Sequence, residues 1–180
     1  MKIRLLGKNL EELKKIVTDE GLPGFTAKQI AQWLYQKKVR SIDDMTNLSK
    51  AARAALAEKY EVGMIEYAGL QLSSDGTKKY LFPVKCTHRR GLNLGSSGQI
   101  PEEELEASAV EAVMIPDADR ATLCVSSQAG CRMGCKFCMT GRQGFHGHLS
   151  AADIISQFLA VDESDKLTNT VFMGMGEPLD

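Results

Sequence analysis

Apolar side chains recur at helical spacing near the start of the chain. A first helix is predicted from four residues with this spacing, namely Leu10, Leu13, Ile16 and Val17. The Gly-Leu-Pro-Gly sequence at 21–24 ends it, because glycine and proline interrupt helices. The pattern therefore indicates that the chain begins with helical structure.

Two further helices are predicted in the same region. Thr26 with Gln29 matches the capping box that begins a helix. Its buried face is expected to contain three residues, Ile30, Trp33 and Leu34. Ser49 is placed to cap a third helix. We therefore expect residues 1–62 to form a separate helical module, with Trp33 in its core rather than stacked on a nucleic-acid base.

The pattern changes from helical to strand-like after Gly63. Residues 65–72 and 78–84 have the composition of strands. Asp75 and Gly76 lie between them, and an Asp-Gly pair in this position is typical of a hairpin turn. The sequence therefore predicts an antiparallel hairpin.

An irregular segment and another strand follow the hairpin. Residues 86–108 contain several glycines and an acidic run, which is typical of a surface connector. Strand character returns at 110–115. We assign residues 63–120 to a β-hairpin region with an irregular connector.

The last third of the chain predicts a strand, a helix and a second strand. Residues 121–127 and 168–175 are the strands, and Ser150 with Asp153 caps a helix of about 12 residues between them. Four residues form the expected apolar face of this helix, namely Ile154, Ile155, Phe158 and Leu159. Such a βαβ unit places its two strands in parallel. The expected class is thus α/β, or α+β overall, with residues 121–180 as the βαβ unit.

Charge and hydropathy limit the partners and the cellular compartment that the sequence predicts. The net charge is −1, but residues 1–60 carry 12 Lys and Arg against 7 Asp and Glu. This local excess is compatible with phosphate contacts, but charge alone favours a solvated helical surface. No apolar run reaches the roughly 18 residues of a membrane span, and the N-terminus does not resemble a secretory signal. Clustered cysteines then indicate ligands rather than disulfides, in a reducing and cytoplasmic setting.

Three of the five cysteines lie within eight residues. Cys131, Cys135 and Cys138 have the spacing C-x3-C-x2-C. Thiolates are soft ligands, and one short loop can direct three of them at a single point. The pattern predicts an iron–sulfur cluster with one iron left open, or zinc with a fourth ligand elsewhere, such as His146 or His148. Buried structural cysteines are the remaining alternative.

A glycine-rich turn ends the second predicted strand. It reads Gly174-Met175-Gly176-Glu177-Pro178. Ligand sites in α/β folds gather at the carboxyl ends of the strands, so this turn and the cysteine loop should open onto one face. Glycine allows close approach of the backbone to a ligand, and Glu177 with exposed carbonyls could hold an ammonium group.

These two motifs together resemble the cluster and cofactor sites of the radical S-adenosylmethionine (SAM) enzymes. The wider sequence resembles one family, the dual-specificity adenine-C2 methyltransferases of ribosomal and transfer RNA. The matching stretches are 25–30, 33–35, 45–49, 75–82, 110–116, 120–131, 140–141, 144–145 and Leu149. The resemblance implies the first βαβ unit of a partial (β/α) barrel.

The resemblance also implies which cofactors are held and where. Cys131, Cys135 and Cys138 would ligate a 4Fe–4S cluster, and Gly176 with Glu177 would bind SAM. The radical chemistry comes from these cofactors, and the protein supplies placement.

Two further residues match catalytic positions of that family. Glu111 matches the proton acceptor. Cys124 matches the cysteine that resolves a protein–RNA crosslink by forming a disulfide. From the residues alone, Glu111 would be a surface glutamate and Cys124 a core cysteine. The implied partners are ribosomal RNA, transfer RNA and a flavodoxin-type electron donor. The alternatives are the adenine-C8 methyltransferases that share the core motifs, and a non-catalytic, metal-stabilised RNA-binding module.

The sequence departs from the family pattern in three places. Residues 86–108 are longer and more irregular than expected, and Cys86 has no matching role. Gly147-His148 replaces an expected basic-polar pair. The chain ends at Asp180, and none of its cysteines matches the methyl-accepting cysteine of the family. We therefore expect the 180-residue chain alone to be inactive. The remaining expectation concerns the histidines at 88, 146 and 148, which should be solvated.

Overall fold

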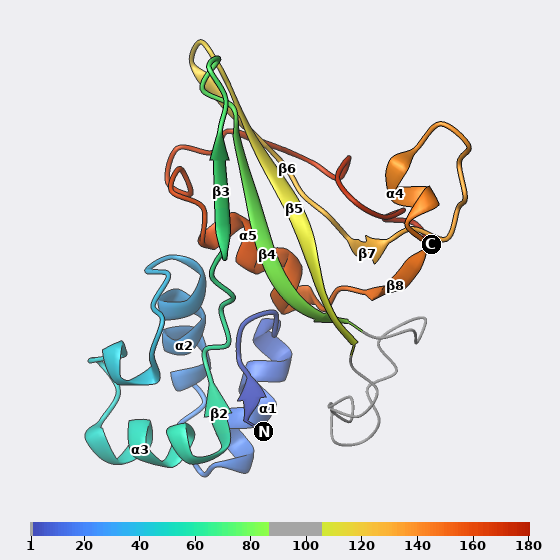
Figure 1. The fold of residues 1–180 in the computed structure, drawn as a ribbon. Helices are drawn as coiled ribbons and strands as arrows, with labels where there is room; N and C mark the ends of the chain where they lie inside the picture. The colour runs from blue at the N-terminus through green and yellow to red at the C-terminus, as the bar shows by residue number, and fades with distance from the viewer. Residues whose placement is uncertain (1, 87–105) are drawn as a thin grey trace. The chain divides into compact units, whose positions relative to one another are not determined.

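The computed structural model describes residues 2–86 and 106–180. The chain divides into two compact units, Met1–Met64 and Ile65–Asp180 (Figure 1). Within the described residues, no helix is both long and apolar enough to cross a bilayer. The remaining residues include His88 and most of the predicted connector, so those expectations lie outside the described part of the chain.

The first unit contains three ten-residue helices around an apolar core. They are α1 (Leu10–Asp19), α2 (Thr26–Tyr35) and α3 (Lys50–Lys59), with a 3₁₀ turn, η1 (Ile42–Asp44), before α3. Two short parallel strands, β1 (Ile3–Arg4) and β2 (Tyr60–Glu61), bring the two ends of the unit together. Its fully buried side chains include Leu5, Leu13, Ile30, Leu34 and Leu56. The helices were predicted, whereas the β1–β2 pair was not.

Helix caps explain where two of these helices begin. The Asn9 side chain accepts the N–H of Glu12 at 2.9 Å, and the Glu12 carboxylate accepts the N–H of Asn9 at 2.8 Å. The predicted Ser49 cap is confirmed, because its hydroxyl accepts the N–H of Ala52 at 3.1 Å. Such caps each stabilise a helix by about 1 kcal/mol.

The predicted capping box at Thr26 is wrong. Phe25 is the N-cap of α2 and already has helical backbone angles, with φ −67° and ψ −20°. Thr26 therefore lies inside the first turn, where its side chain is buried and caps no N–H. The N–H of Thr26 instead donates to the carbonyl of Pro23 at 2.9 Å, so the preceding turn leads directly into the helix.

The expectation that Trp33 belongs to the core is also wrong. Its side chain is half-buried, and its indole N–H donates to the Asn47 side chain. The Lys37 ammonium lies 3.8 Å from the centre of its ring. A tryptophan that satisfies its N–H at the edge of a core is common, because one end of the indole is polar.

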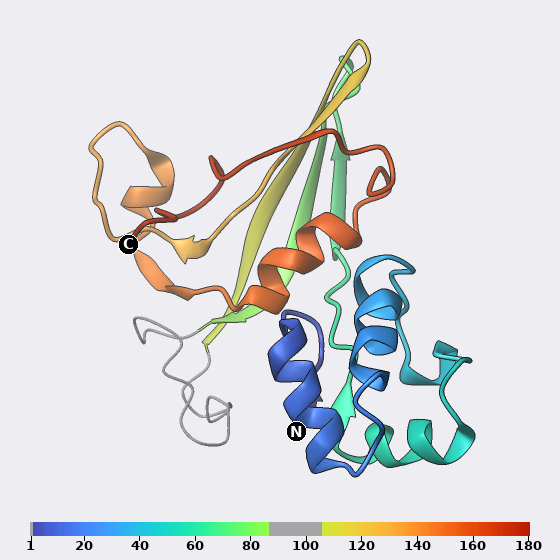
Figure 2. The same ribbon diagram turned by 180° about the vertical axis from the view of Figure 1, so that it is seen from behind.

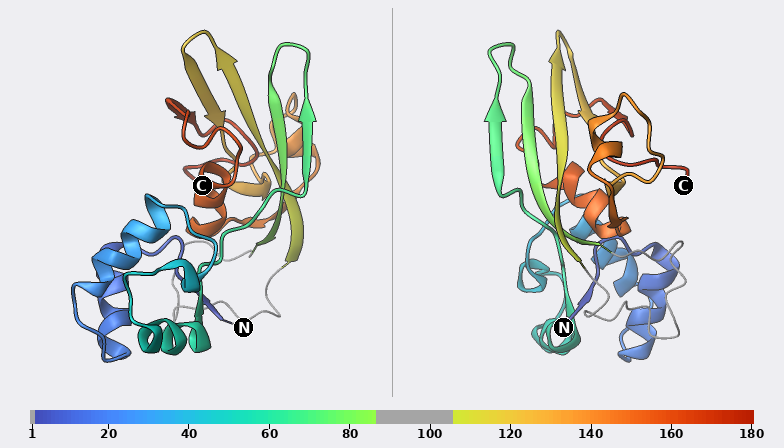
Figure 3. Two further views of the ribbon diagram at one scale, coloured as in Figure 1. Left: turned by 90° about the vertical axis from the view of Figure 1, so that its left-hand side faces the viewer. Right: turned by 45° about the vertical axis from the view of Figure 1, so that its right-hand side comes forward.

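The second unit is built on a five-stranded sheet. Its strand order is β3-β4-β5-β6-β9, and all neighbours are antiparallel except β6 and β9. The bounds are β3 (Gly69–Leu72), β4 (Lys78–Cys86), β5 (Glu106–Asp117), β6 (Arg120–Cys124) and β9 (Asn169–Val171). Figure 3 shows the β3–β4 and β5–β6 hairpins side by side. The strands expected in 63–120 and 121–180 therefore belong to one sheet.

The predicted hairpin turn and βαβ unit are confirmed. Gly76 has a φ of +85°, and Asp75 accepts the N–H of Thr77 at 2.9 Å in the turn between β3 and β4. Helix α5 (Ala151–Leu159) connects β6 to β9, whose parallel register pairs Cys124 with Val171. Both strands are shorter than predicted, because the segments after them turn toward each other.

Helix α5 begins as predicted but buries a different face. Ser150 and Asp153 form the expected capping box, and the helix has nine residues rather than about 12. Its buried residues are Ala152, Asp153, Ser156 and Gln157. The predicted apolar face is only half-buried. The reason is that the polar side chains of Ser156 and Gln157 bond to backbone groups of the same unit.

The alternation of side chains gives the sheet two distinct faces, and α5 covers one of them (Figure 2). Helix α5 lies across the face whose buried residues include Tyr80, Phe82, Ala112, Met114 and Leu123. Tyr80 links that face to the turn after α5, since its hydroxyl donates to Glu163 at 2.7 Å. The opposite face, which we call the open face, carries Lys79, Leu81, Glu111, Val113 and Cys124.

Candidate active site

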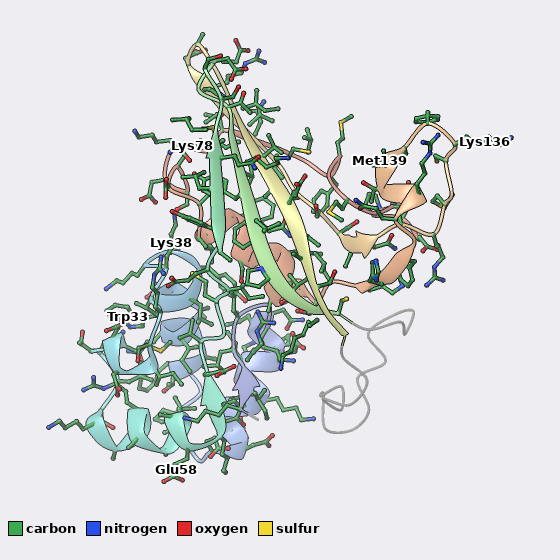
Figure 4. All side chains as sticks on the ribbon, in the orientation of Figure 1. Trp33, Lys38, Glu58, Lys78, Lys136 and Met139 are labelled. Carbon is green, nitrogen blue, oxygen red and sulfur yellow. The ribbon has the colours of Figure 1, made fainter. Side chains whose placement is uncertain are left out.

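A small two-stranded sheet positions the cysteine loop. Strand β7 (Gln128–Gly130) follows β6 after three residues and pairs antiparallel with β8 (Phe145–His148). The segment between them holds the three clustered cysteines and a short helix, α4 (Met139–Arg142). Figure 4 marks Lys136 and Met139 on this segment. Neither β7, β8 nor α4 was expected from the sequence.

The base of the loop is closed by an unusually close backbone approach. Gly130 has a φ of +71°, and a Cβ there would lie 1.9 Å from the carbonyl oxygen of Gly144. Only glycine fits at that distance. The next residue, Cys131, then donates its N–H to the same oxygen at 2.9 Å. The first cysteine is thereby fixed to the strand pair.

The other two cysteines are held by the start of α4. The N–H of Cys138 donates to the carbonyl of Cys135 at 3.1 Å, and Cys138 is the N-cap of α4. Hydrogen bonds from the backbone N–H groups of Gly141 and Thr140 lower the pKa of the Cys138 thiol, which favours the thiolate that metals bind. The three cysteines are free thiols and none is fully buried. This donor set fits an iron–sulfur cluster.

The structure does not gather the three sulfurs into a metal site. Among the described residues, no group of three or more His, Cys, Asp or Glu side chains has an arrangement that could hold a metal ion. The expectation that the sulfurs converge is therefore not met, although the cysteines share one loop. Loops of this kind are organised by the metal itself, because thiolates gain nothing from proximity without it.

The glycine-rich turn after β9 lies against the segment that joins β6 to β7. Gly174 N–H donates to Val125 at 3.1 Å, and the N–H groups of Ser127 and Gln128 both donate to the Met175 carbonyl, at 2.9 and 3.2 Å. We call residues 125–128 and 174–177, with these bonds, the strand-end pairing. It places the turn beside the start of the cysteine loop, as the sequence predicted.

Gly174 and Gly176 of the turn allow the two segments of this pairing to approach closely. A Cβ on Gly174 would lie 2.6 Å from the Val125 carbonyl oxygen, and one on Gly176 would lie 2.5 Å from the Cβ of Gln128. The sequence led us to expect that glycine allows a ligand to approach. In the structure, the groups that approach Gly174 and Gly176 belong to the chain itself.

Gln128 connects the turn to the cysteine loop. Its buried side-chain oxygen accepts the N–H of Glu177 at 3.0 Å, and its amide nitrogen donates to Asp180 at 3.2 Å. Asp180 also pairs with Arg132 at 3.3 Å, and Arg132 directly follows the first clustered cysteine. Its guanidinium lies 4.2 Å from the centre of the Phe145 ring. Sequence reasoning did not identify Gln128, because no periodic signal marks a buried amide.

The two remaining site residues share the open face of the sheet. Cys124 is paired with Val113, and Glu111 lies two residues before Val113 on β5, so both side chains point to the same side. Glu111 forms an ion pair with Lys79 at 3.2 Å and is about half exposed, with 46% of its side-chain surface accessible. Burial raises the pKa of Cys124, although the N–H of Met173 opposes this. The structure thus brings Glu111 and Cys124 together beside the strand-end pairing.

Comparisons with known proteins show which proteins this chain resembles. Residues 3–62 match the family model described as the ribosomal RNA large subunit methyltransferase N-terminal domain. The probable dual-specificity RNA methyltransferase RlmN of Bacteroides fragilis is 52% identical over 179 residues. That alignment covers 99% of this chain and 46% of the relative. Residues 3–62 thus resemble the N-terminal domain of these methyltransferases, and nearly the whole chain is similar to part of an RlmN protein.

Two further proteins show the same similarity. The dual-specificity RNA methyltransferase RlmN of Geotalea uraniireducens is 41% identical over 178 residues, which cover 99% of this chain and 46% of the relative. The crystal structure of a radical SAM methyltransferase from Sphaerobacter thermophilus superimposes with a TM-score of 0.77 and 32% identity. It covers 98% of this chain, which in turn covers 48% of that protein. The chain thus spans a little under half the length of these RlmN relatives.

Cys86 and His146 belong to neither segment of the strand-end pairing, whereas His148 contacts Gln128. Cys86 is buried, with its sulfur 3.4 Å from the carbonyl oxygen of His146. The His146 side chain is exposed, as expected. His148 is half-buried instead, with its ring 5.0 Å from that of Phe145 and its Nδ1 3.3 Å from the Gln128 amide. The expectation that His148 is solvated is therefore wrong.

Two glycine substitutions separate crowding from backbone strain. Gly176 and Gly144 have similar positive φ values, +97° and +86°, but a Cβ on Gly144 meets nothing within 4 Å. Gly144→Ala should cost about 1–2 kcal/mol, because only the left-handed backbone is strained. Gly176→Ala should cost about 2 kcal/mol more, because its Cβ also clashes with Gln128.

Urea unfolding followed by far-UV circular dichroism measures this difference. Fluorescence of the single tryptophan, Trp33, reports separately on Met1–Met64 and should not change in either variant. Equal losses of stability in the two variants would contradict the close approach of the turn to Gln128.

Proposed function

We propose that this chain is part of a radical SAM enzyme that methylates C2 of adenine in ribosomal and transfer RNA. The observation that carries the proposal is the strand-end pairing, which joins the cysteine loop to the Gly-Met-Gly-Glu-Pro turn through hydrogen bonds of 2.9–3.2 Å. The names of the RlmN relatives, dual-specificity RNA methyltransferases, support the reaction class and the RNA substrates. The structural similarity to a radical SAM methyltransferase of Sphaerobacter thermophilus supports the radical SAM chemistry.

The cofactors of the proposed reaction are a 4Fe–4S cluster and SAM. Cys131, Cys135 and Cys138 would hold the cluster, which leaves one iron for the amino and carboxylate groups of SAM. Gly176 and Glu177 would hold the SAM amino group. When bound, the reduced cluster and SAM together supply a 5′-deoxyadenosyl radical. The chain contributes thiolates at one end of the site and the turn at the other.

Glu111 and Cys124 would act on the RNA and on a protein-bound methyl group. Glu111 is proposed to take the proton from adenine C2 after the methyl carbon has become attached there. A carboxylate can do this only close to the reacting carbon, and Glu111 is accessible on the open face. Cys124, on the same face, is proposed to attack the sulfur of the methyl-carrying cysteine. The disulfide forms as the bond from that sulfur to the RNA-bound carbon breaks, and this carbon takes the electron pair and a proton to become the methyl group. The methyl-carrying cysteine of this route is not among the cysteines assigned here.

The helical unit is proposed to contact the RNA. Its support is the local basic excess of residues 1–60 and the match of residues 3–62 to an RNA methyltransferase N-terminal domain. A flavodoxin-type protein is the proposed electron donor, and the cytoplasm is the proposed location. Thiols of this kind persist in reducing compartments.

Transfer of labelled methyl groups tests the proposed function. The full-length protein that carries this chain, with cluster, reductant and methyl-labelled SAM under anaerobic conditions, should label C2 of adenine in an RNA fragment. Cys131→Ala should abolish 5′-deoxyadenosine formation. Cys86→Ala, at a cysteine outside both the strand-end pairing and the C-x3-C-x2-C motif, is the matched control and should retain it. Residues 1–180 alone should transfer no label.

Each departure from these results has a definite meaning. Label at C8 of adenine instead of C2 would show that the proposed position of methylation is wrong. Label in RNA from the 180-residue chain alone would show that the methyl-cysteine route is wrong for this protein. Retention of SAM cleavage by Cys131→Ala would contradict the assignment of the cluster ligands.

Deletion of the helical unit tests its proposed contact with RNA. Removal of residues 1–64 from the full-length protein should weaken RNA binding at least about tenfold, because the phosphate contacts of the basic unit are lost. SAM cleavage without RNA should continue at the parent rate. Binding is measured by fluorescence anisotropy at fixed salt, and an unchanged RNA affinity would limit the unit to a structural role.

A further inference from the structure

Ser126 lies at the centre of the strand-end pairing and is fully buried. Its hydroxyl donates to the backbone carbonyl of Glu111 at 2.6 Å. The same oxygen accepts the N–H of Met175 at 2.8 Å. A single side-chain atom therefore joins the strand that carries Glu111 to the turn that carries Glu177.

Gln157 fixes the backbone of that serine. Its side chain is fully buried on α5, the helix that lies across the sheet in Figure 2. Its amide oxygen accepts the N–H of Ser126 at 2.8 Å, and its amide nitrogen donates to the carbonyl of Ser126 at 3.0 Å. The Gln157 side chain thus satisfies both the backbone N–H and the backbone carbonyl of Ser126. These two bonds fix both the position and the orientation of the Ser126 backbone.

We propose that Ser126 and Gln157 are positioning residues, and this inference rests on the proposed function. Gln157 holds Ser126 in place from α5. The Ser126 hydroxyl then sets the separation between Glu111 and the turn that includes Gly176 and Glu177. The group that would accept the proton and the group that would hold SAM are thereby kept at one fixed spacing.

A role in general stability alone would not require this arrangement. Helix α5 is already attached to the rest of the unit by Ser156, whose hydroxyl accepts the N–H of Ile65 at 3.0 Å. The turn is already held by the backbone bonds of Gly174 and Met175. The Ser126 hydroxyl adds a bridge from the turn to Glu111, and the spacing between those two elements is what a reaction at one adenine needs.

The first test removes one oxygen atom from the cofactor-free chain. Ser126→Ala should leave the fold intact and speed hydrogen exchange at the Met175 amide about tenfold, because a buried N–H loses its acceptor. Ser127→Ala is the matched control. Among the described residues the Ser127 hydroxyl makes no hydrogen bond, so its loss should leave exchange at Met175 unchanged. An unchanged Met175 amide in Ser126→Ala would overturn the bridge.

The second test measures coupling in the full-length enzyme. Ser126→Ala should raise the ratio of 5′-deoxyadenosine formed to methyl transferred about tenfold, because radicals form while Glu111 is misplaced. A merely structural role would lower both products in proportion. Ser126→Thr, which keeps the hydroxyl, should restore the ratio toward that of the parent enzyme. Gln157→Leu should raise the ratio in the same direction as Ser126→Ala.

The outcomes separate the two proposals. If the parent enzyme transfers no methyl group to RNA, the proposed function fails and the positioning role falls with it. If the parent enzyme transfers methyl groups and Ser126→Ala has the same product ratio, only the positioning role is overturned. Circular dichroism shows whether Gln157→Leu folds. If it does not fold, the product ratio of Ser126→Ala decides whether the positioning role holds.

Discussion

The hydrogen bonds between residues 125–128 and 174–177 are the interaction on which the candidate site depends. They form where β6 and β9 end, so two parallel strands bring two distant sequence motifs to the same place. Steric contact constrains this pairing as well as the hydrogen bonds. Gly174 and Gly176 leave no space for a Cβ against the 125–128 segment. Without this close approach the cysteine loop and the turn could not border one small molecule.

Buried polar side chains make this pairing specific. Ser126, Gln128 and Gln157 are almost completely buried, and each side chain forms more than one hydrogen bond, with groups of the pairing, of β5 or of Asp180. A buried polar group costs about 1–3 kcal/mol if its partner is removed, whereas its net gain when satisfied is smaller. Such a network therefore selects one arrangement of the strand ends more strongly than it stabilises the fold. Under the proposed function, one fixed arrangement would hold SAM, the Glu111 carboxylate and the adenine base in place.

Local patterns in the sequence predicted most of the elements but fewer of their contacts. The Ser49 and Ser150 caps and the Asp75-Gly76 turn were predicted because each depends on residues close in sequence. The buried face of α5 was not predicted, because Gln157 bonds to Ser126, 31 positions away, and Ser156 accepts the N–H of Ile65, 91 positions away. Tertiary hydrogen bonds of this kind leave no periodic signal.

The same distinction applies to the site. Spacing alone predicted that Cys131, Cys135 and Cys138 are ligands on one loop, and family resemblance predicted the roles of Glu111 and Cys124. The shared face of the last two follows from strand register, which the sequence did not supply. Register depends on which residues of β5 and β6 face each other, and short strands leave that choice to packing.

Electron paramagnetic resonance of the reconstituted chain tests the central claim most directly. After anaerobic reconstitution, residues 1–180 should bind about four iron and four sulfide ions, consistent with one 4Fe–4S cluster. On reduction, addition of SAM should change the spectrum of the cluster in the parent chain, and Gly176→Ala should require a much higher SAM concentration for the same change. A colourless protein that binds zinc, or a cluster whose spectrum does not change when SAM is added, would contradict a shared site at the two strand ends.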